Sequence, residues 1–303
     1  MTFRFLGTGT SVGVPQIGCT CKVCRSSDPR DRRRRCGAYV TACDGSAIVI
    51  DTPLETREAS LEYGIDKVDA VVITHAHMDH VAGFDDIRRF NTINGEWVEC
   101  DPNEPGANGR TCRCKGKVMP CYAMRETEEM MHRIFPYISA KGGENGLYRP
   151  QVEFVNDDVF RIGSSVSVER FRVEHGFPCC GYLVKEEGRG EKEEVRSKRE
   201  EVSEKGEEAA RLAYVSDCHE ICDEAVERIR GVDVLVLKCL RERQHPTHLN
   251  LSMALDYVRR IAPKKAYFVH MCHDFLHEEW LEKLGGTCVE PAYDGLELEV
   301  KAS

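Results

Sequence analysis

The sequence predicts an α/β fold in which short strands alternate with helices over a single domain, residues 1–303. Three observations support this prediction. Apolar residues make up 41% of the chain, which is enough to build a core. The longest apolar runs, such as residues 69–74 and 232–238, have the length of strands. A length of 303 residues suits one large domain or two small ones, and a single domain reaches this size when its sheets are extensive.

The first strands are expected at Thr2–Gly7, Ala38–Cys43 and Ser46–Ile50. The last two should form a hairpin, because the Asp44-Gly45 pair between them is typical of a tight turn. Val68–Thr74 is an almost continuous apolar run, as expected for a strand that is buried on both faces.

The later elements alternate in the same way. We expect further strands at Lys117–Tyr122, Val152–Val155, Val166–Val173, Tyr182–Lys185, Ala213–Ser216, Val232–Lys238, Ala266–His270 and Leu296–Lys301. The predicted helices are Asp85–Phe90, Glu126–Phe135, Ile221–Ile229, Leu251–Ile261 and Phe275–Leu284.

Two stretches interrupt this order. Residues 91–115 are rich in Gly, Pro, Asn and Cys, and we interpret them as a long insertion. Residues 186–209 are dense in Glu, Lys and Arg, which indicates a solvated hairpin extension or a flexible loop.

Composition limits the compartment and the partners. No apolar run is long enough to cross a bilayer, and the first residues lack the features of a signal peptide, so we expect a cytoplasmic protein without a membrane partner. Its sixteen cysteines should then stay reduced, and the closely spaced ones are better suited to metal binding than to disulfides. The net charge of -9 argues against a long nucleic acid as a substrate.

The segment from Thr74 to His80 carries the strongest functional signal. It places His75, His77, Asp79 and His80 directly after a predicted buried strand. Imidazole and carboxylate are the usual ligands of zinc and of harder divalent ions. Burying so many polar groups without partners would be costly, so this pattern indicates a metal site.

The His-x-His-x-Asp-His pattern resembles the signature of the metallo-β-lactamase superfamily. This resemblance implies an αββα sandwich, with two mixed sheets flanked by helices, and a pair of zinc or manganese ions at one sheet edge. The later ligands of the family pattern match His175, Asp217 and His270, each near the end of a predicted strand. By analogy, one metal is held by His75, His77 and His175, the other by Asp79, His80 and His270, and Asp217 bridges them.

The identity of His77 favours hydrolysis over redox chemistry, because di-iron relatives usually carry a Glu in that place. A pair of metal ions can supply a nucleophilic hydroxide near neutral pH and neutralise charge on a phosphoryl oxygen.

A cysteine cluster narrows the resemblance. Cys19, Cys21 and Cys24 form a Cys-x-Cys-x-x-Cys pattern, which indicates a structural zinc. His273 is the expected fourth ligand, and Cys272 competes for that role. The surrounding residues, 6–19, resemble the PhnP group of phosphoribosyl 1,2-cyclic phosphate phosphodiesterases, which carries such a zinc site.

This resemblance implies a function. His248 matches the histidine that protonates the leaving group, with His245 close by, and Asp79 is the second residue expected to take part in catalysis. The expected activity is the hydrolysis of a small cyclic phosphodiester, with 5-phosphoribosyl 1,2-cyclic phosphate giving ribose 1,5-bisphosphate as the best guess. Family members are often dimers, so a homodimer is possible.

Several alternatives stay open at this point. The chain could be an RNA-processing nuclease of the tRNA 3′-end type, a hydrolase of lactones, thioesters or β-lactams, a relative of the PQQ-biosynthesis proteins, or a zinc-binding protein without activity. A further zinc site is conceivable at Cys100, Cys112, Cys114 and Cys121.

Overall fold

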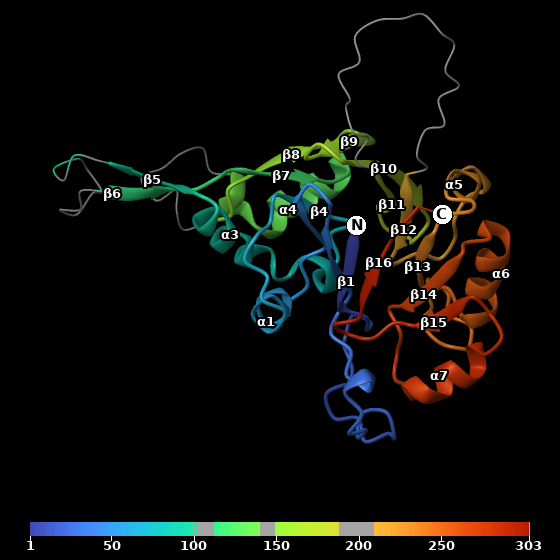
Figure 1. The fold of residues 1–303 in the computed structure, drawn as a ribbon. Coiled ribbons are helices and arrows are strands. Elements are labelled where there is room, and N and C mark those ends of the chain that lie inside the picture. Colours follow the sequence, from blue (N-terminus) through green and yellow to red (C-terminus); the bar gives the residue numbers. More distant parts are fainter. Residues whose placement is uncertain (100, 102, 104–111, 140–148, 188–208, 303) are drawn as a thin grey trace, which may run out of the picture.

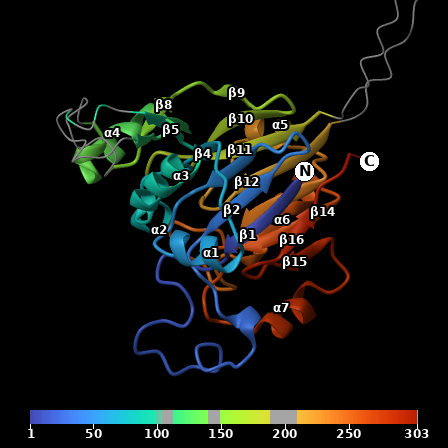
Figure 2. The same ribbon diagram turned by 60° about the vertical axis from the view of Figure 1, so that its left-hand side comes forward.

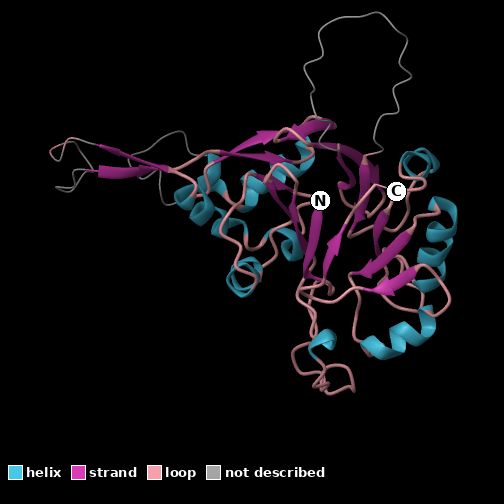
Figure 3. Cartoon of the chain, in the orientation of Figure 1, coloured by secondary structure: helices cyan, strands magenta, loops and turns pink. Residues whose placement is uncertain are grey.

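The computed structural model describes residues 1–99, 101, 103, 112–139, 149–187 and 209–302. Two large β-sheets face each other, and helices cover their outer sides (Figure 1). Colouring by secondary structure shows the same four layers, helix, sheet, sheet and helix (Figure 3).

The first sheet contains seven strands in the order β16-β1-β2-β3-β4-β7-β8. Their bounds are β16 (Glu297–Glu299), β1 (Thr2–Gly7), β2 (Gly37–Thr41), β3 (Ala47–Ile50), β4 (Ala70–Val72), β7 (Met119–Tyr122) and β8 (Val152–Val155). The pairs from β16 to β3 are antiparallel, and those from β3 to β8 are parallel.

The second sheet also has seven strands, in the order β15-β14-β13-β12-β11-β10-β9. Their bounds are β15 (Val289–Pro291), β14 (Lys265–Val269), β13 (Val234–Lys238), β12 (Ala210–Val215), β11 (Cys179–Glu186), β10 (Val166–Val173) and β9 (Val159–Ile162). The pairs between β15 and β12 are parallel, and those from β12 to β9 are antiparallel. The predicted αββα sandwich with two mixed sheets is therefore confirmed.

The helices divide between the two outer sides (Figures 1 and 2). On the side of the first sheet lie α1 (Thr56–Glu62), α2 (Met78–Val81), α3 (Ile87–Ile93) and α4 (Arg125–Ile134). On the side of the second sheet lie α5 (Asp223–Arg228), α6 (Leu251–Ile261) and α7 (His277–Leu284). None of the helices in the described ranges combines the length and apolarity needed to cross a membrane.

The core has three layers that follow the alternation of side chains along the strands. In β3, Ile48 and Ile50 pack between the two sheets, whereas Val49 packs beneath the helices of the first sheet. Because successive strand residues point to opposite faces, a strand that is apolar throughout is buried on both sides. A third cluster fills the space between the second sheet and its helices.

The predicted hairpin between β2 and β3 forms, with Thr41 opposite Ala47. Gly45 adopts a φ of +83°, a backbone conformation that favours glycine. The Asp44 carboxylate in this turn also accepts hydrogen bonds from the backbone of Ser164 (2.7 Å) and Ser165 (3.1 Å), in the turn between β9 and β10. Asp44 thus joins the two sheets at one end.

Some predicted boundaries differ from the observed ones. Residues 91–93, expected in the insertion, belong to α3, and Asn91 is buried with its side-chain amide donating to the carbonyls of Lys117 and Gln151. Strands β5 (Glu96–Glu99) and β6 (Cys112–Lys115) form a separate hairpin that projects from the body (Figure 1). Most of the charged stretch, residues 188–208, lies outside the described residues, but Glu186 ends β11 and is buried.

Of the further zinc ligands considered above, Cys100 and the side chains of Cys112 and Cys114 lie outside the described residues. Cys121 is fully buried in the core beneath the helices of the first sheet. Burial raises the pKa of its thiol, which disfavours the thiolate form that binds zinc.

Candidate metal centre

The carboxyl ends of several strands meet at one edge of the sandwich and carry the predicted ligands. His75 follows β4, His175 follows β10, Asp217 follows β12 and His270 follows β14. Since the strands that precede these residues belong to two facing sheets, residues distant in the sequence can approach one another there.

The first group consists of His75, His77, His175 and Asp217, whose ligand atoms all lie within 4.8 Å of one another. Nε2 of His75 lies 3.0 Å from Nδ1 of His77. Nε2 of His175 lies 3.1 Å from Oδ2 of Asp217. Three imidazoles and one carboxylate therefore converge on one point.

The second group consists of Asp79, His80, Asp217 and His270, again with ligand atoms within 4.8 Å. Nε2 of His270 lies 3.5 Å from Oδ2 of Asp79 and 3.3 Å from Oδ2 of Asp217. The same oxygen of Asp217 thus faces both groups. This is the geometry required of a carboxylate that bridges two metal ions.

The donor set fits a pair of divalent cations. Nε2 of His80 and Nε2 of His270 are both buried without a hydrogen-bond partner among the described residues, although each faces carboxylate oxygens. Burial, followed by the neighbouring His80, lowers the pKa of His75 well below its usual value and so favours the neutral imidazole. Neutral imidazoles and ionised carboxylates are the ligands that zinc and manganese accept in proteins.

Asp51 holds His80 in place. Nδ1 of His80 donates to Oδ2 of Asp51 over 2.7 Å, and the backbone N–H of Thr74 donates to Oδ1 over 2.8 Å. Burial alone would lower the pKa of His80, but without a metal ion the charge and hydrogen bond of Asp51 raise it to about 10, so a bound cation must displace the proton from Nε2. A carboxylate behind a ligand histidine fixes the orientation of its ring, so that Nε2 faces the metal.

The sequence interpretation missed Asp51. It stands directly after a predicted strand, as the other site carboxylate Asp217 does, and that position was an available signal. Its φ of +59° is unusual for a residue other than glycine, as is the +57° of the ligand His270.

Lys238 is a second residue that sequence reasoning missed. Its side chain is fully buried at the end of β13, and its amine contacts both Oδ1 of Asp217 and Nδ1 of His248. A charged residue at the end of an otherwise apolar buried strand was the signal for it. The two oxygens of Asp217 therefore have separate surroundings. Oδ2 faces the two ligand groups, and Oδ1 faces Lys238 and His248.

His248 lies beside the two ligand groups. Its ring centroid is 5.4 Å from that of His175 and 5.6 Å from that of His270, and 20% of its side chain is exposed. The competing His245 is 4.5 Å from His248 and lines a cavity of about 440 Å³ with His219, Gln244, Pro246 and Met253. His248 is thus the histidine next to the centre, whereas His245 lines the cavity.

The cysteine cluster forms a second ligand set. Sγ of Cys19, Cys21 and Cys24 lie 3.3, 3.4 and 3.4 Å from Nδ1 of His273. Cys272 does not join this group, and its backbone carbonyl instead accepts a hydrogen bond from the buried Arg33. Three thiols and one imidazole match a structural zinc site.

Comparisons with known proteins agree with this geometry. Residues 46–271 match the family model described as the β-lactamase superfamily domain. A solved structure described as a new diphosphatase from the PhnP family has 33% sequence identity, a TM-score of 0.75 and coverage of 99% of this chain and 98% of the other. Zinc-bound PqqB from Methylobacterium extorquens shares the fold, with 17% identity, a TM-score of 0.65 and coverage of 99% and 100%.

One curated relative is named as a transferase and not as a hydrolase. An octanoyltransferase of Porphyromonas gingivalis is 29% identical over 295 residues, which cover 96% of this chain and 50% of the relative. The chain therefore spans about half the length of this curated relative.

Proposed function

The chain belongs to the metallo-β-lactamase superfamily, in its PhnP family, as a metal-dependent hydrolase, and we propose that it hydrolyses a small cyclic phosphodiester. The observation that carries this proposal is the position of Asp217. Its Oδ2 faces both ligand groups, while its Oδ1 contacts Lys238, which in turn contacts His248. This arrangement couples a metal pair to a residue that can transfer a proton.

The ligand side chains are positioned by contacts with neighbouring residues. Two zinc or manganese ions bound by the two groups would supply electrophilic stabilisation of a phosphoryl group and an activated water. Asp51 orients His80, and Phe177 stacks on His77 with ring centroids 4.4 Å apart. These contacts hold His80 of the second ligand group and His77 of the first in fixed orientations.

The contact with Lys238 favours the tautomer of His248 that carries its proton on Nε2. An ammonium group can only donate hydrogen bonds, so both Asp217 Oδ1 and His248 Nδ1 act as acceptors toward Lys238. In the tautomer that accepts from Lys238, the proton of a neutral His248 lies on Nε2. Oδ1 of Asp217 also lies 3.2 Å from Nδ1 and can accept from it when Nδ1 is protonated. In the Nε2–H tautomer His248 has an N–H to give to an oxygen that leaves phosphorus.

The proposed reaction opens a cyclic phosphate. One P–O ester bond breaks and a water oxygen bonds to phosphorus. The proton on His248 Nε2 passes to the leaving alkoxide oxygen while Lys238 gives a proton to Nδ1, so that His248 stays neutral, and the proton released by the water restores Lys238. The product is a phosphomonoester. For 5-phosphoribosyl 1,2-cyclic phosphate, the substrate we propose, it is ribose 1,5-bisphosphate. A small substrate also suits the net charge of -9, which is unfavourable for a long polyanion.

A diphosphate ester is the second candidate substrate, because the 33% identical PhnP-family structure is described as a diphosphatase. Both candidates present a phosphoryl group to the same ligand groups, but they differ in leaving group. An alkoxide needs a proton far more than a phosphate does, so a strong dependence on His248 favours the cyclic ester.

Assays with matched substrates test the proposal. Metal-loaded protein should hydrolyse bis-p-nitrophenyl phosphate and a cyclic ribose phosphate, and should leave an octanoyl thioester intact. Turnover of the thioester without turnover of either phosphodiester would replace this proposal with an acyl-transfer or thioesterase function.

A further inference from the structure

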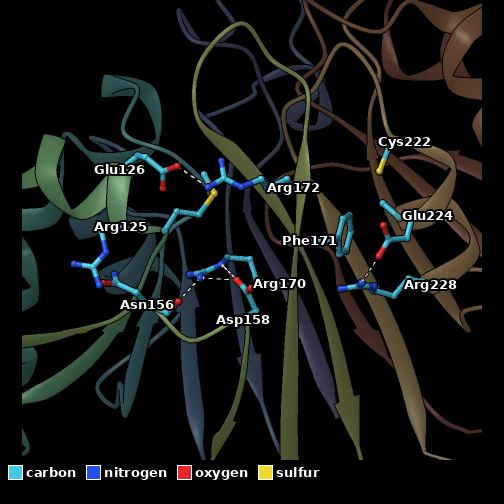
Figure 4. A pocket seen from close by; sticks show the side chains of 12 residues that line it. Arg125, Glu126, Asn156, Asp158, Arg170, Phe171, Arg172, Cys222, Glu224 and Arg228 are labelled. Atoms are coloured by element: carbon cyan, nitrogen blue, oxygen red, sulfur yellow. Dashed lines mark hydrogen bonds and ion pairs between the residues drawn. The ribbon is translucent and has the colours of Figure 1, made fainter.

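A cavity of about 430 Å³ opens on the side of the sandwich (Figure 4). Its walls come from the start of α4, the turn between β8 and β9, the second half of β10 and the region of α5. Four arginines and three carboxylates line it, namely Arg125, Arg170, Arg172, Arg228, Glu126, Asp158 and Glu224. None of these residues belongs to the two ligand groups or to the cysteine cluster.

A backbone donor faces this cavity. Strand β9 pairs with β10 only as far as Glu169. Beyond that point the N–H of Arg170 donates to Asp158 (2.7 Å) and the N–H of Glu174 donates to Glu220 (2.9 Å). Alternate N–H groups of a strand point to the same side, so the N–H of Arg172 points into the gap between these two bonds. Within the described ranges it has no acceptor.

The side chains of the cavity provide a surplus of positive charge. Glu126 pairs with Arg172 (2.5 Å), Asp158 with Arg170 (2.8 Å) and Glu224 with Arg228 (3.0 Å), as the dashed lines in Figure 4 show. Arg125 remains as the fourth cation and forms no ion pair in the part of the chain that the structure describes. The Arg170 side chain is only 6% exposed, so its charge is poorly solvated.

The start of α4 adds to this surplus. This helix has ten residues, begins at Arg125, and its N-cap residue Met124 makes no side-chain hydrogen bond. The first N–H groups of a helix have no partner within the helix, and they carry a partial positive charge. The Glu126 carboxylate accepts a hydrogen bond from its own backbone N–H in this first turn, whereas no carboxylate of the cavity pairs with Arg125 or with the N–H of Arg172.

We propose that this cavity is a binding site for a phosphate dianion, either free phosphate or the phosphate group of a small sugar phosphate. Guanidinium groups and backbone N–H donors match the tetrahedral oxygens of phosphate. The site is separate from the metal centre, because Arg172 precedes His175 by three residues of extended chain, or about 10 Å.

Calorimetric titration of the metal-loaded protein with inorganic phosphate and with ribose 5-phosphate tests this proposal. The double variant Arg125→Gln/Arg172→Gln should lose affinity for the anion at one site by roughly tenfold or more, since it removes two charged donors. Arg259→Gln is the matched control, because Arg259 is 69% exposed on α6, outside the cavity. It should bind as the wild type does.

The two ligands distinguish the source of the phosphate. Equal affinities would assign the site to free phosphate. Tighter binding of ribose 5-phosphate than of free phosphate by the wild type would assign the site to the second phosphate of the substrate. The double variant should then have a raised KM for a phosphorylated cyclic substrate and unchanged turnover of bis-p-nitrophenyl phosphate. This kinetic result rests on the proposed function.

Wild-type binding of both anions by the double variant would overturn the proposal, even if the protein remains an active phosphodiesterase. If the double variant does not fold, Arg125→Gln alone replaces it, because Arg125 has no ion pair among the described residues to lose.

Discussion

The buried ammonium of Lys238 donates a hydrogen bond to Oδ1 of Asp217, the carboxylate whose other oxygen faces both groups of metal ligands. The same ammonium contacts Nδ1 of His248. One lysine thus links a ligand shared by both metal positions to the residue proposed as the proton donor.

His248→Ala should lower turnover of a cyclic ribose phosphate by roughly 10²- to 10⁴-fold, the usual contribution of a general acid. The loss should be much smaller with bis-p-nitrophenyl phosphate, because p-nitrophenolate leaves without a proton. Metal analysis of the same sample should show an unchanged metal content. Equal losses with both substrates would reject the role of His248 as a proton donor.

Lys238→Met should reduce turnover of the cyclic substrate, because His248 loses the contact that favours its Nε2–H tautomer and can supply a proton to Nδ1. Since Lys238 acts through His248, the double variant Lys238→Met/His248→Ala should be no slower than His248→Ala alone. Steady-state rates of the four proteins measure this coupling. Additive losses would mean that Lys238 serves Asp217 and the fold, independently of His248.

Cys21→Ser should release the zinc of the cysteine cluster and lower the melting temperature by about 4 °C or more, because a structural zinc contributes directly to folding. Turnover should also fall, since His273 in this cluster follows the ligand His270 by three residues. Cys272→Ser is the control, because Cys272 lies outside the cluster and should keep the zinc. If Cys272→Ser loses the zinc and Cys21→Ser keeps it, then Cys272, and not Cys21, binds the zinc.

Asp44→Asn should reduce stability at neutral pH and have less effect in acid. Burial alone would raise the pKa of Asp44, but hydrogen bonds from Ser46 and Ser164 hold it well below its usual value of 3.8. A depressed pKa stabilises the fold above the unfolded value, and this stabilisation is lost as the pH falls below it. Glycine at position 163 keeps the site open, because a Cβ there would lie 1.9 Å from Oγ of Ser46.

Urea unfolding of wild type and Asp44→Asn measures this effect. The difference in unfolding free energy should be about 1–3 kcal/mol at pH 7, the range for hydrogen bonds to a charged group, and should shrink below pH 4. A difference that stays constant across this range would show that the charge of Asp44 contributes nothing.

Much of this molecule follows from sequence patterns with a regular spacing. The strand before His75 was predictable because a continuous apolar run implies burial on both faces. His175, Asp217 and His270 were identified through the resemblance to the metallo-β-lactamase superfamily, each near the end of a predicted strand. Tight spacing also identified the cysteine cluster, and the structure selected His273 over Cys272.

Other features depend on contacts that the sequence does not encode locally. Asp51 lies 29 residues from His80 in the chain, and the pairing of β3 with β4 brings them together. Lys238 lies 10 residues from His248, and the loop between β13 and α6 folds back to join them. The cavity beside β10 arises from a strand, two helix starts and a turn that meet in space. The short helix α1 was missed because its seven residues show no clear apolar period.

The central claim is tested most directly by following 5-phosphoribosyl 1,2-cyclic phosphate by phosphorus NMR with the metal-loaded protein and with Asp79→Asn. We expect wild type to convert the cyclic diester signal into a second monoester signal, and the variant to do so at least about 100-fold more slowly. A wild-type protein that carries both metal ions yet leaves the cyclic diester unchanged would contradict the account.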